Sequence, residues 1–433
     1  MKFKIHRGTK EIGGSCVEIW TANSRIFLDM GMPLVDEKRE QFNFEKYKNL
    51  EVNELVKQKI LPDTKGIYDS KDRLIDGVLI SHPHLDHFGF IKFVNEKVKI
   101  FLGEATHKII EISNIFTSSN YQIKNYEYFE KEKLFQIGDF RIIPYWNDHS
   151  AFDSYSFLIE ASGKSIFYSG DFRDHGRKSK VFKRFLNNAP QNVDYLILEG
   201  TTIGRNKIKN KTEIEVENEL IKVFSESQKI NLVYVAGQNI DRLVSIFKAC
   251  LKAKKILVID VYIAKILTEL SKFSKVPYPS DSYNIRVIFS YYSCKKLTEE
   301  GNEKVMFQFK KYKITKDEIS NQSGRIVMIV RPSMKIDLKG INNLQSGNLI
   351  YSMWEGYLKK DYTNDFIEYL KNLNFLIHKI HTSGHADIYA LQKMVTAIKP
   401  KNIVPIHTFD SNLYQKYFNF PIINCNDREE INV

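Results

Sequence analysis

The sequence predicts an α/β protein of more than one domain, and two observations carry that prediction. The chain has 433 residues, a length typical of two or three ordinary domains. Short apolar runs of β type recur along it, and from about Arg205 onward they alternate with helix-like stretches. This alternation is the pattern of an α/β unit built on a mostly parallel sheet.

The predicted strands are short runs rich in β-branched and aromatic residues. In the first half of the chain they are Arg25–Leu28, Gly77–Ile80, Phe140–Tyr145, Ser165–Tyr168 and Tyr195–Leu198. In the second half they are Leu232–Val235, Ile256–Ile259, Arg286–Phe289, Ile326–Val330 and Leu349–Ser352. Near the end, Phe375–Ile380 and Ile403–Ile406 are predicted strands on either side of a helix over Ile388–Ile398.

The bulk composition is that of an ordinary globular protein, with 43% hydrophobic and 27% charged residues, and it excludes wholesale disorder. A net charge of +12 favours a polyanionic partner, although a solvated lysine-rich face explains the same charge. The four cysteines form no C-x-x-C pair, which argues against a disulfide framework or a thiolate metal site. Without a visible signal peptide or membrane-length apolar run, we expect a cytoplasmic protein with no membrane partner.

A cluster of metal-ligand residues follows the predicted strand Gly77–Ile80. The run SHPHLDHFG holds His82, His84, Asp86 and His87. Imidazole suits zinc, and a carboxylate can complete such a site. A polar surface loop with chance histidines is the alternative, but crowding these groups is costly unless a cation binds them. The run therefore predicts a metal site.

Other acidic and histidine residues sit at or after the ends of predicted strands. They are Asp29, His149, Asp171, Glu199, His385 and His407. Each alone is equally explained as a turn residue or a cap. Together they predict a catalytic edge of a sheet assembly, because strand ends are where such sites are built.

These motifs resemble a known superfamily. HPHLDH, with Asp29, His149 and Asp171, is similar to the metallo-β-lactamase fold. LILEGTT, HTSGHA and PKNIVPIHT resemble the β-CASP branch, which includes RNase J, the cleavage-and-polyadenylation endonuclease and Artemis. The stretch VYVAGQNIDR (Val233–Arg242) resembles the opening of the β-CASP insert.

The resemblance implies an α/β architecture in which a metallo-β-lactamase αββα sandwich carries an inserted α/β β-CASP domain. Residues 1–203 and 372–433 would form the sandwich, and residues 204–371 the insert. The substrate is then expected in the cleft between them, a common site position.

The resemblance also implies a role for each matched residue. Two zinc ions are expected, with Mn²⁺ as an alternative because such donors accept both ions. One zinc would be held by His82, His84 and His149. The other would be held by Asp86, His87 and His407, with Asp171 bridging and Asp29 orienting a ligand imidazole. The catalytic residues would be Asp86, Glu199 and His385, the last two forming the pair that protonates the leaving oxygen.

The activity implied is hydrolysis of RNA, and single-stranded RNA is the expected partner. His407 favours RNA, because the Artemis-like DNA members generally lack it. The alternatives are a β-CASP DNA nuclease, a small-molecule hydrolase, and a catalytically silent RNA-binding or scaffold subunit. The chain ends soon after PIHT, has Ala386 after SGH and Thr408 after His407, and these departures put RNase J-like 5′-exonuclease behaviour in doubt.

Several further residues are candidate substrate contacts, each with a structural alternative. They are Ser383, Gly384, Arg331, Ser333, Arg173 and His175. Ser383 and Gly384 could hold a phosphate, or Gly384 could serve a tight turn. The segment Phe307–Lys316 suits either single-strand stacking or an edge strand. The sequence leaves open internal against terminal cleavage, the RNA that is cut, and monomer against homodimer.

Overall fold

The structure is a computed structural model that describes residues 1–36, 39–69, 71–117, 120–205 and 209–433. It divides into two compact units. Unit 1 comprises Met1–Ile110, Asn120–Lys209 and Gly384–Val433, and unit 2 comprises Glu111–Ser119 and Asn210–Ser383. The units thus divide after residues 209 and 383, later in the chain than the predicted limits of 203 and 371.

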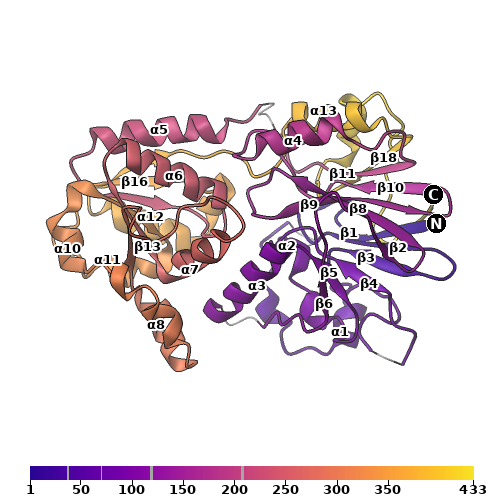
Figure 1. Ribbon diagram of the computed structural model, residues 1–433, viewed down its shortest axis with the longest axis horizontal. Helices are drawn as coiled ribbons and strands as arrows, with labels where there is room; N and C mark the ends of the chain where they lie inside the picture. The colour runs from indigo at the N-terminus through magenta and orange to yellow at the C-terminus, as the bar shows by residue number, and fades with distance from the viewer. Residues whose placement is uncertain (37–38, 70, 118–119, 206–208) are drawn as a thin grey trace. The chain divides into compact units, whose positions relative to one another are not determined.

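Unit 1 contains two sheets (Figure 1). The first has, in spatial order, β19 (Glu430–Asn432), β1 (Lys2–Arg7), β2 (Cys16–Trp20), β3 (Arg25–Leu28), β4 (Gly77–Leu79), β5 (Ile100–Leu102) and β6 (Tyr126–Tyr128). The second has β18 (Asn402–Ile406), β11 (Tyr195–Glu199), β10 (Lys164–Tyr168), β9 (Ser154–Ala161), β8 (Phe140–Asn147) and β7 (Phe135–Ile137). Most of the predicted strands therefore form within a residue or two of their expected bounds.

Alternation along the strands packs these two sheets face to face. In β3, Ile26 and Leu28 enter the core shared by both sheets, while Phe27 enters a separate core on the outer face. In β11, Ile197 enters the shared core, while its neighbours on either side enter the outer core of the second sheet. Because successive side chains of a strand point to opposite faces, each sheet is covered on both sides.

Helices complete the outer layers of unit 1. The outer core of the first sheet takes in residues of α1 (Val52–Lys57), α2 (Leu85–Phe88) and α3 (Glu104–Phe116). The outer core of the second sheet takes in residues of α4 (Ser179–Asn187) and α13 (Ile388–Ile398). The result is helix, sheet, sheet, helix, which is the predicted αββα sandwich.

Unit 2 is built on one sheet in which every strand pairing is parallel. Its order is β14 (Ile285–Ile288), β13 (Ile256–Asp260), β15 (Ile326–Val330), β12 (Asn231–Tyr234), β16 (Asn348–Tyr351) and β17 (Leu376–Lys379). The central strands are buried along their whole length, as expected for a parallel sheet covered on both faces. The α/β insert predicted from the strand–helix alternation is therefore present.

One helix of unit 2 precedes its first strand, and the other helices lie between its strands along the chain. In chain order, the helices are α5 (Glu213–Glu226), α6 (Ile240–Lys252), α7 (Val261–Leu270), α8 (Tyr291–Glu299), α9 (Glu303–Phe307), α10 (Lys316–Asn321), α11 (Lys335–Leu338) and α12 (Asp361–Lys371). Short 3₁₀ segments in the two units are Phe44–Lys46, Ile91–Phe93, Lys310–Tyr312, Ser323–Arg325, Pro332–Met334, Glu355–Lys359 and Ser411–Lys416.

One of the two alternatives for the segment Phe307–Lys316 is wrong. The segment Phe307–Lys316 is not an edge strand but joins the end of α9 to a 3₁₀ turn and the start of α10. In a strand, Phe307 and Phe309 would share a face, yet Phe307 is 58% exposed and Phe309 is 2% exposed. Within the described ranges, none of the helices combines the length and the hydrophobicity needed to cross a bilayer.

Candidate metal centre

The predicted site residues lie where strands of unit 1 end. Asp29 follows β3, and the run Ser81–Gly89 follows β4, which pairs with β3 in parallel. In the second sheet, Asp171 follows β10, Glu199 ends β11 and His407 follows β18, and these strands are parallel neighbours. Parallel strands bring their carboxyl ends to one edge, so side chains distant in sequence meet there.

Three imidazoles form a first cluster. His84 is the residue before α2, and its Nδ1 lies 3.1 Å from Nε2 of His82. Nε2 of His149, which follows β8, lies 3.4 Å from the same Nδ1. These ring nitrogens converge closely enough to hold one metal ion.

Asp86, His87 and His407 form a second cluster next to the first. Oδ2 of Asp86 lies 3.2 Å from Nε2 of His407. Asp171 lies between the clusters, because its Oδ2 is 3.2 Å from Nε2 of His87 and 3.8 Å from Nε2 of both His82 and His407. One carboxylate can therefore serve two neighbouring cations.

The protonation of the first cluster suits a cation. Burial holds the pKa of His82 and His149 well below its usual range, and lowers that of His84 to about 4. The three rings are therefore neutral at physiological pH, and neutral imidazole is the form that binds metal. Three neutral nitrogens facing one another are the donor set expected for zinc.

The second cluster combines carboxylates with imidazoles that retain their protons. Burial opposes a charged imidazole at His87, but Asp171 and Asp29 outweigh it and hold the pKa of His87 well above its usual value. Burial likewise opposes a charged His407, and Asp171 with Asp86 raises its pKa. Despite burial, the hydrogen bond from His407 helps lower the pKa of Asp86 to about 2. A divalent cation would replace the protons that the imidazoles share with the carboxylates, and it would balance the negative charge of those carboxylates.

Asp29 orients one of these imidazoles. Its Oδ2 lies 2.7 Å from Nδ1 of His87 and accepts a hydrogen bond of 2.8 Å from the Tyr168 hydroxyl. The Ser81 backbone N–H donates to Oδ1 at 2.7 Å. Asp29 itself has a left-handed backbone (φ 60°), which is uncommon for non-glycine residues and more frequent for Asp and Asn. Holding Nδ1–H of His87 in this way leaves Nε2 facing Asp171.

Glu199 and His385 lie beside the second cluster. Nδ1 of His385 is 3.3 Å from Oε2 of Glu199 and 3.5 Å from Oδ2 of Asp171. Glu199 is fixed in turn by the Phe172 backbone N–H, which donates to its Oε1 at 3.0 Å. The His385 side chain is 22% exposed, whereas that of Glu199 is 1% exposed. The histidine is therefore the member of the pair that a substrate can reach.

Comparison with known families agrees with this geometry. Residues 53–235 match the β-lactamase superfamily domain, and residues 372–414 match the Zn-dependent metallo-hydrolase RNA specificity domain. The first match contains His82, His84 and Asp171, and the second contains His385 and His407. The chain belongs to the metallo-β-lactamase superfamily. Its similarity to ribonuclease J identifies the branch as β-CASP.

Individual relatives match different shares of this metallo-β-lactamase chain. A ribonuclease J from Helicobacter pylori strain B128 is 24% identical over 413 residues, which is 92% of this chain and 55% of the relative. An RNase J-like protein from Methanocaldococcus jannaschii is 27% identical over 237 residues, 52% of this chain and 48% of the relative. The chain thus spans about half the length of these curated relatives.

A solved structure of unknown function from Enterococcus faecalis V583 has the same fold. It matches 99% of both chains with a TM-score of 0.80 at 21% identity. This match and the two domain matches confirm the predicted fold class of a metallo-β-lactamase sandwich with an inserted domain.

The candidate substrate contacts occupy less uniform positions. Arg173 is fully buried and ion-paired with Asp148, which fits a structural role better than the predicted contact. His175 is also buried, with its Nδ1 3.8 Å from the Asp174 carboxylate. Gly384 has no left-handed φ, so the tight-turn explanation fails. It is needed because a Cβ there would lie 2.6 Å from the Ser150 hydroxyl.

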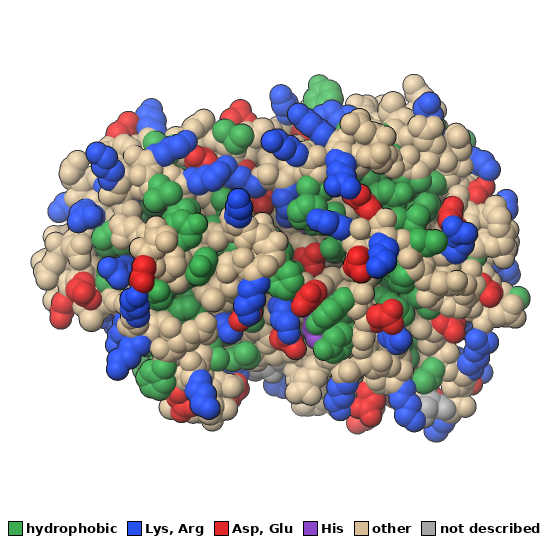
Figure 2. Space-filling model, in the orientation of Figure 1, with side chains coloured by type: hydrophobic (Ala, Val, Ile, Leu, Met, Phe, Trp, Pro, Cys, Tyr) green, Lys and Arg blue, Asp and Glu red, His purple; other side chains and the backbone are tan. Residues whose placement is uncertain are grey.

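Three other candidate contacts lie in unit 2. Arg331 follows β15 and is ion-paired with Asp260 at the end of β13. Ser333 is exposed, and Ser383 is half-buried at the end of the unit. Figure 2 shows Lys and Arg side chains scattered among Asp and Glu over the visible face. On this face, the basic side chains are therefore not separated from the acidic ones.

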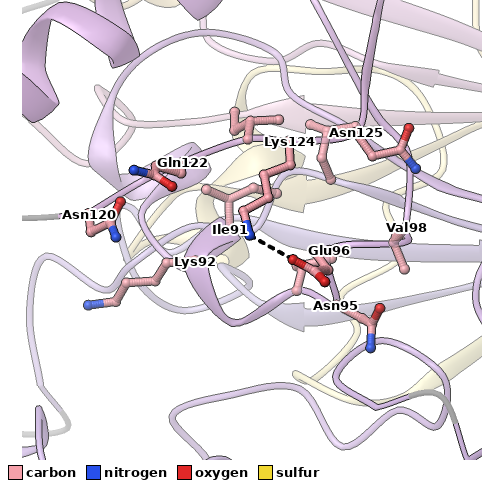
Figure 3. Close-up of a pocket in the computed structure, with 12 residues that line it drawn as sticks. Ile91, Lys92, Asn95, Glu96, Val98, Asn120, Gln122, Lys124 and Asn125 are labelled. Carbon is pink, nitrogen blue, oxygen red and sulfur yellow. Dashed lines mark hydrogen bonds and ion pairs between the residues drawn. The ribbon is translucent and has the colours of Figure 1, made fainter.

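A separate pocket of about 230 Å³ lies in unit 1 (Figure 3). It is lined by residues of the segments 91–100 and 120–125, among them Asn95, Asn120 and Gln122. The ion pair between Lys124 and Glu96 lies across it. None of its lining residues is a ligand of the metal centre.

Sequence reasoning missed the uncharged residues that hold the centre in place. The Ser81 hydroxyl donates to Asp29, the Tyr168 hydroxyl does the same, and the Thr201 hydroxyl contacts two histidines. Hydroxyl residues are common at strand ends and carry no distinctive spacing. The available signal was their position, since each lies next to or within two residues of a predicted site residue or strand end.

Proposed function

We propose that the protein is a ribonuclease that binds two zinc ions and hydrolyses phosphodiester bonds of RNA. The two adjacent donor clusters, which share Asp171, support two metal positions. The match to the RNA specificity domain over residues 372–414 and the ribonuclease J relatives support RNA as the substrate. We also infer that unit 2 is the β-CASP insert. Cytoplasmic location and homodimeric assembly stay predictions.

Each residue of the centre has a distinct task in this proposal. When bound, two zinc ions would neutralise the charge that develops on the phosphoryl oxygens and acidify a water for attack near neutral pH. His82, His84 and His149 would hold one ion, and Asp86, His87 and His407 the other. Asp86 would therefore act in catalysis as a ligand.

The observation that carries the proposal is the position of His385. Its Nδ1 lies 3.3 Å from Glu199 and 3.5 Å from Asp171, so the ring sits beside the carboxylate that both clusters share. With Nδ1–H directed to these acids, the doubly protonated ring can give its Nε2 proton to the leaving oxygen and keep the hydrogen on Nδ1. Phosphodiester hydrolysis needs such a donor, because it expels an alkoxide.

The test is to separate metal binding from cleavage at His385. The variant His385→Ala should retain both zinc ions and lose roughly a hundred- to ten-thousand-fold in cleavage of labelled single-stranded RNA. Zinc would be counted by elemental analysis. His378→Ala is a matched control, because His378 binds the Asn348 side chain in unit 2 and should leave both readouts unchanged. Loss of zinc from His385→Ala would make His385 a ligand and contradict the assignment.

Substrate class is tested by parallel incubation with single-stranded RNA and DNA of one sequence, with and without a chelator. We expect chelator-sensitive cleavage of RNA. Faster cleavage of DNA would favour the alternative DNA nuclease. An absence of cleavage with both zinc ions bound would favour a silent RNA-binding subunit. Product sizes from 5′- and 3′-labelled RNA would distinguish internal from terminal cleavage.

A further inference from the structure

The Thr201 hydroxyl lies between the second ligand cluster and His385. Thr201 is the second residue after the end of β11 and is 3% exposed. Its Oγ1 is 2.8 Å from Nδ1 of His407, 3.2 Å from Nδ1 of His385 and 3.4 Å from the backbone oxygen of His407. One buried oxygen atom thus contacts both His385 and His407.

The chemistry of the partners assigns the protons. Nε2 of His407 faces the carboxylates of Asp86 and Asp171, at 3.2 Å and 3.8 Å, so this is the nitrogen that can bind a cation. A neutral imidazole that binds through Nε2 carries its hydrogen on Nδ1. Nδ1–H of His407 therefore donates to Thr201 Oγ1 at 2.8 Å.

The same argument applies to His385. Its Nδ1 faces the carboxylates of Glu199 and Asp171, which accept hydrogen bonds, so this nitrogen also carries a hydrogen. A hydroxyl has two acceptor positions and one donor hydrogen. Thr201 can accept from Nδ1–H of His407, share the Nδ1–H of His385 with the two carboxylates, and donate to the backbone oxygen of His407.

We propose that Thr201 is a positioning residue that holds a hydrogen on Nδ1 of both His407 and His385, so that one hydroxyl orients a metal ligand through its free Nε2 and the proton donor through its protonated ring. The proposal rests on the proposed function for the role of His385. Its part at His407 concerns zinc binding alone. It parallels the role of Asp29 at His87, with a neutral hydroxyl in place of a carboxylate.

The first test measures zinc affinity without RNA. In Thr201→Val, which keeps the shape of the side chain, the second zinc should bind about 10- to 100-fold more weakly, the usual loss when such a partner is removed. Competition with a chromophoric chelator would resolve two binding steps, and the tighter step should not change. Thr201→Ser should restore the affinity. Unchanged affinity in Thr201→Val, or a Thr201→Ser variant that behaves like it, would overturn the proposal.

The matched control is the neighbouring residue. Thr202 is similarly buried, and its hydroxyl donates to the Ala386 backbone oxygen at 2.6 Å. Among the described residues, no hydrogen bond joins this hydroxyl to a histidine side chain. Thr202→Val should keep both zinc affinities. An equal loss in Thr202→Val would show that any buried hydroxyl change loosens the centre, and would overturn the specific role of Thr201.

A second measurement does not depend on a variant that folds. Side-chain ¹⁵N spectra of the zinc-loaded wild-type protein should show His407 and His385 with a hydrogen on Nδ1. A hydrogen on Nε2 of His407 with zinc on Nδ1 would overturn the proposal. If the protein binds two zinc ions with this tautomer but cuts no RNA, the proposed function fails while the role of Thr201 at His407 stands.

Discussion

The two clusters of candidate metal ligands in unit 1 lie next to each other but differ in the side chains that form them. The first consists of three imidazoles, two of them buried and that of His84 partly exposed, and the pKa values of all three are lowered. The second combines a carboxylate with two imidazoles whose pKa values are raised by neighbouring acids that outweigh burial. The first cluster therefore presents neutral donors that are ready to bind, whereas the second holds protons that a cation must displace.

The difference also appears in the residues behind the ligands. Asp29 and Thr201 support His87 and His407 of the second cluster. In the first cluster, Nδ1 of His149 is buried without a hydrogen-bond partner among the described residues. We infer that zinc affinity is more easily changed at the second position, because the protonation and the orientation of its ligands depend on several neighbouring residues.

The largest effect is expected from the residue that both clusters share. Asp171→Asn should lower the affinity for both zinc ions and reduce RNA cleavage roughly a thousandfold or more, because a buried anionic ligand becomes neutral. Zinc analysis and initial cleavage rates would measure this. Retention of both ions at wild-type affinity would remove Asp171 from its bridging role.

Substitutions within one cluster should separate the two positions. His84→Ala should weaken binding at the first position and His407→Ala at the second, each leaving about one zinc per chain, since each removes one donor of a three-residue set. Elemental analysis after dialysis would give the stoichiometry. If His407→Ala still binds two ions, His407 is not a ligand and the second cluster is wrongly composed.

Acidification should empty the second position first. His87 and His407 have raised pKa values, so each retains its proton near neutrality and competes with the metal increasingly as the pH falls. The first cluster stays neutral until the pH approaches the pKa of His84, about 4. Between about pH 8 and pH 6, affinity should therefore fall for one zinc and hold nearly constant for the other. Parallel falls at both positions would contradict the comparison.

The smallest of these effects is expected for substitution of a residue that holds a metal ligand in place. Asp29→Asn should weaken the second zinc about 10- to 100-fold, because an amide holds the Nδ1–H of His87 less strongly than a carboxylate. Asp76→Asn is a matched control, since Asp76 accepts from the Arg25 backbone N–H, lies 3.6 Å from the Arg73 guanidinium and is outside the centre. Chelator competition would compare the two variants. A weakened first zinc with an intact second would reverse the assignment of Asp29.

The sequence predicted the parts of this centre that are local or strongly patterned. His82, His84, Asp86 and His87 lie within a few residues of each other, so their proximity is covalent. The alternation of apolar residues predicted the strands, and parallel strands gather their carboxyl ends. This is why Asp171, although far along the chain, could be placed near them.

What the sequence could not supply depends on packing between distant segments. The sequence suggested Arg173 as a basic contact for the substrate, but its guanidinium is buried in an ion pair with Asp148. The sequence suggested that Gly384 serves a turn. A glycine is needed there because the Ser150 side chain lies too close to leave room for a Cβ. Phe307–Lys316 has aromatic residues at strand-like spacing, yet only one of the two phenylalanines is buried. Thr201 carried no signal, because a hydroxyl becomes informative only when its neighbours are known.

The central claim is tested most directly by titrating zinc into the metal-free protein while following cleavage of labelled single-stranded RNA at neutral pH. The first cluster should fill first, since it releases no protons, and cleavage should stay low through the first equivalent. It should then rise to its maximum with the second. Full cleavage after one equivalent, or none after two, would contradict a two-zinc ribonuclease.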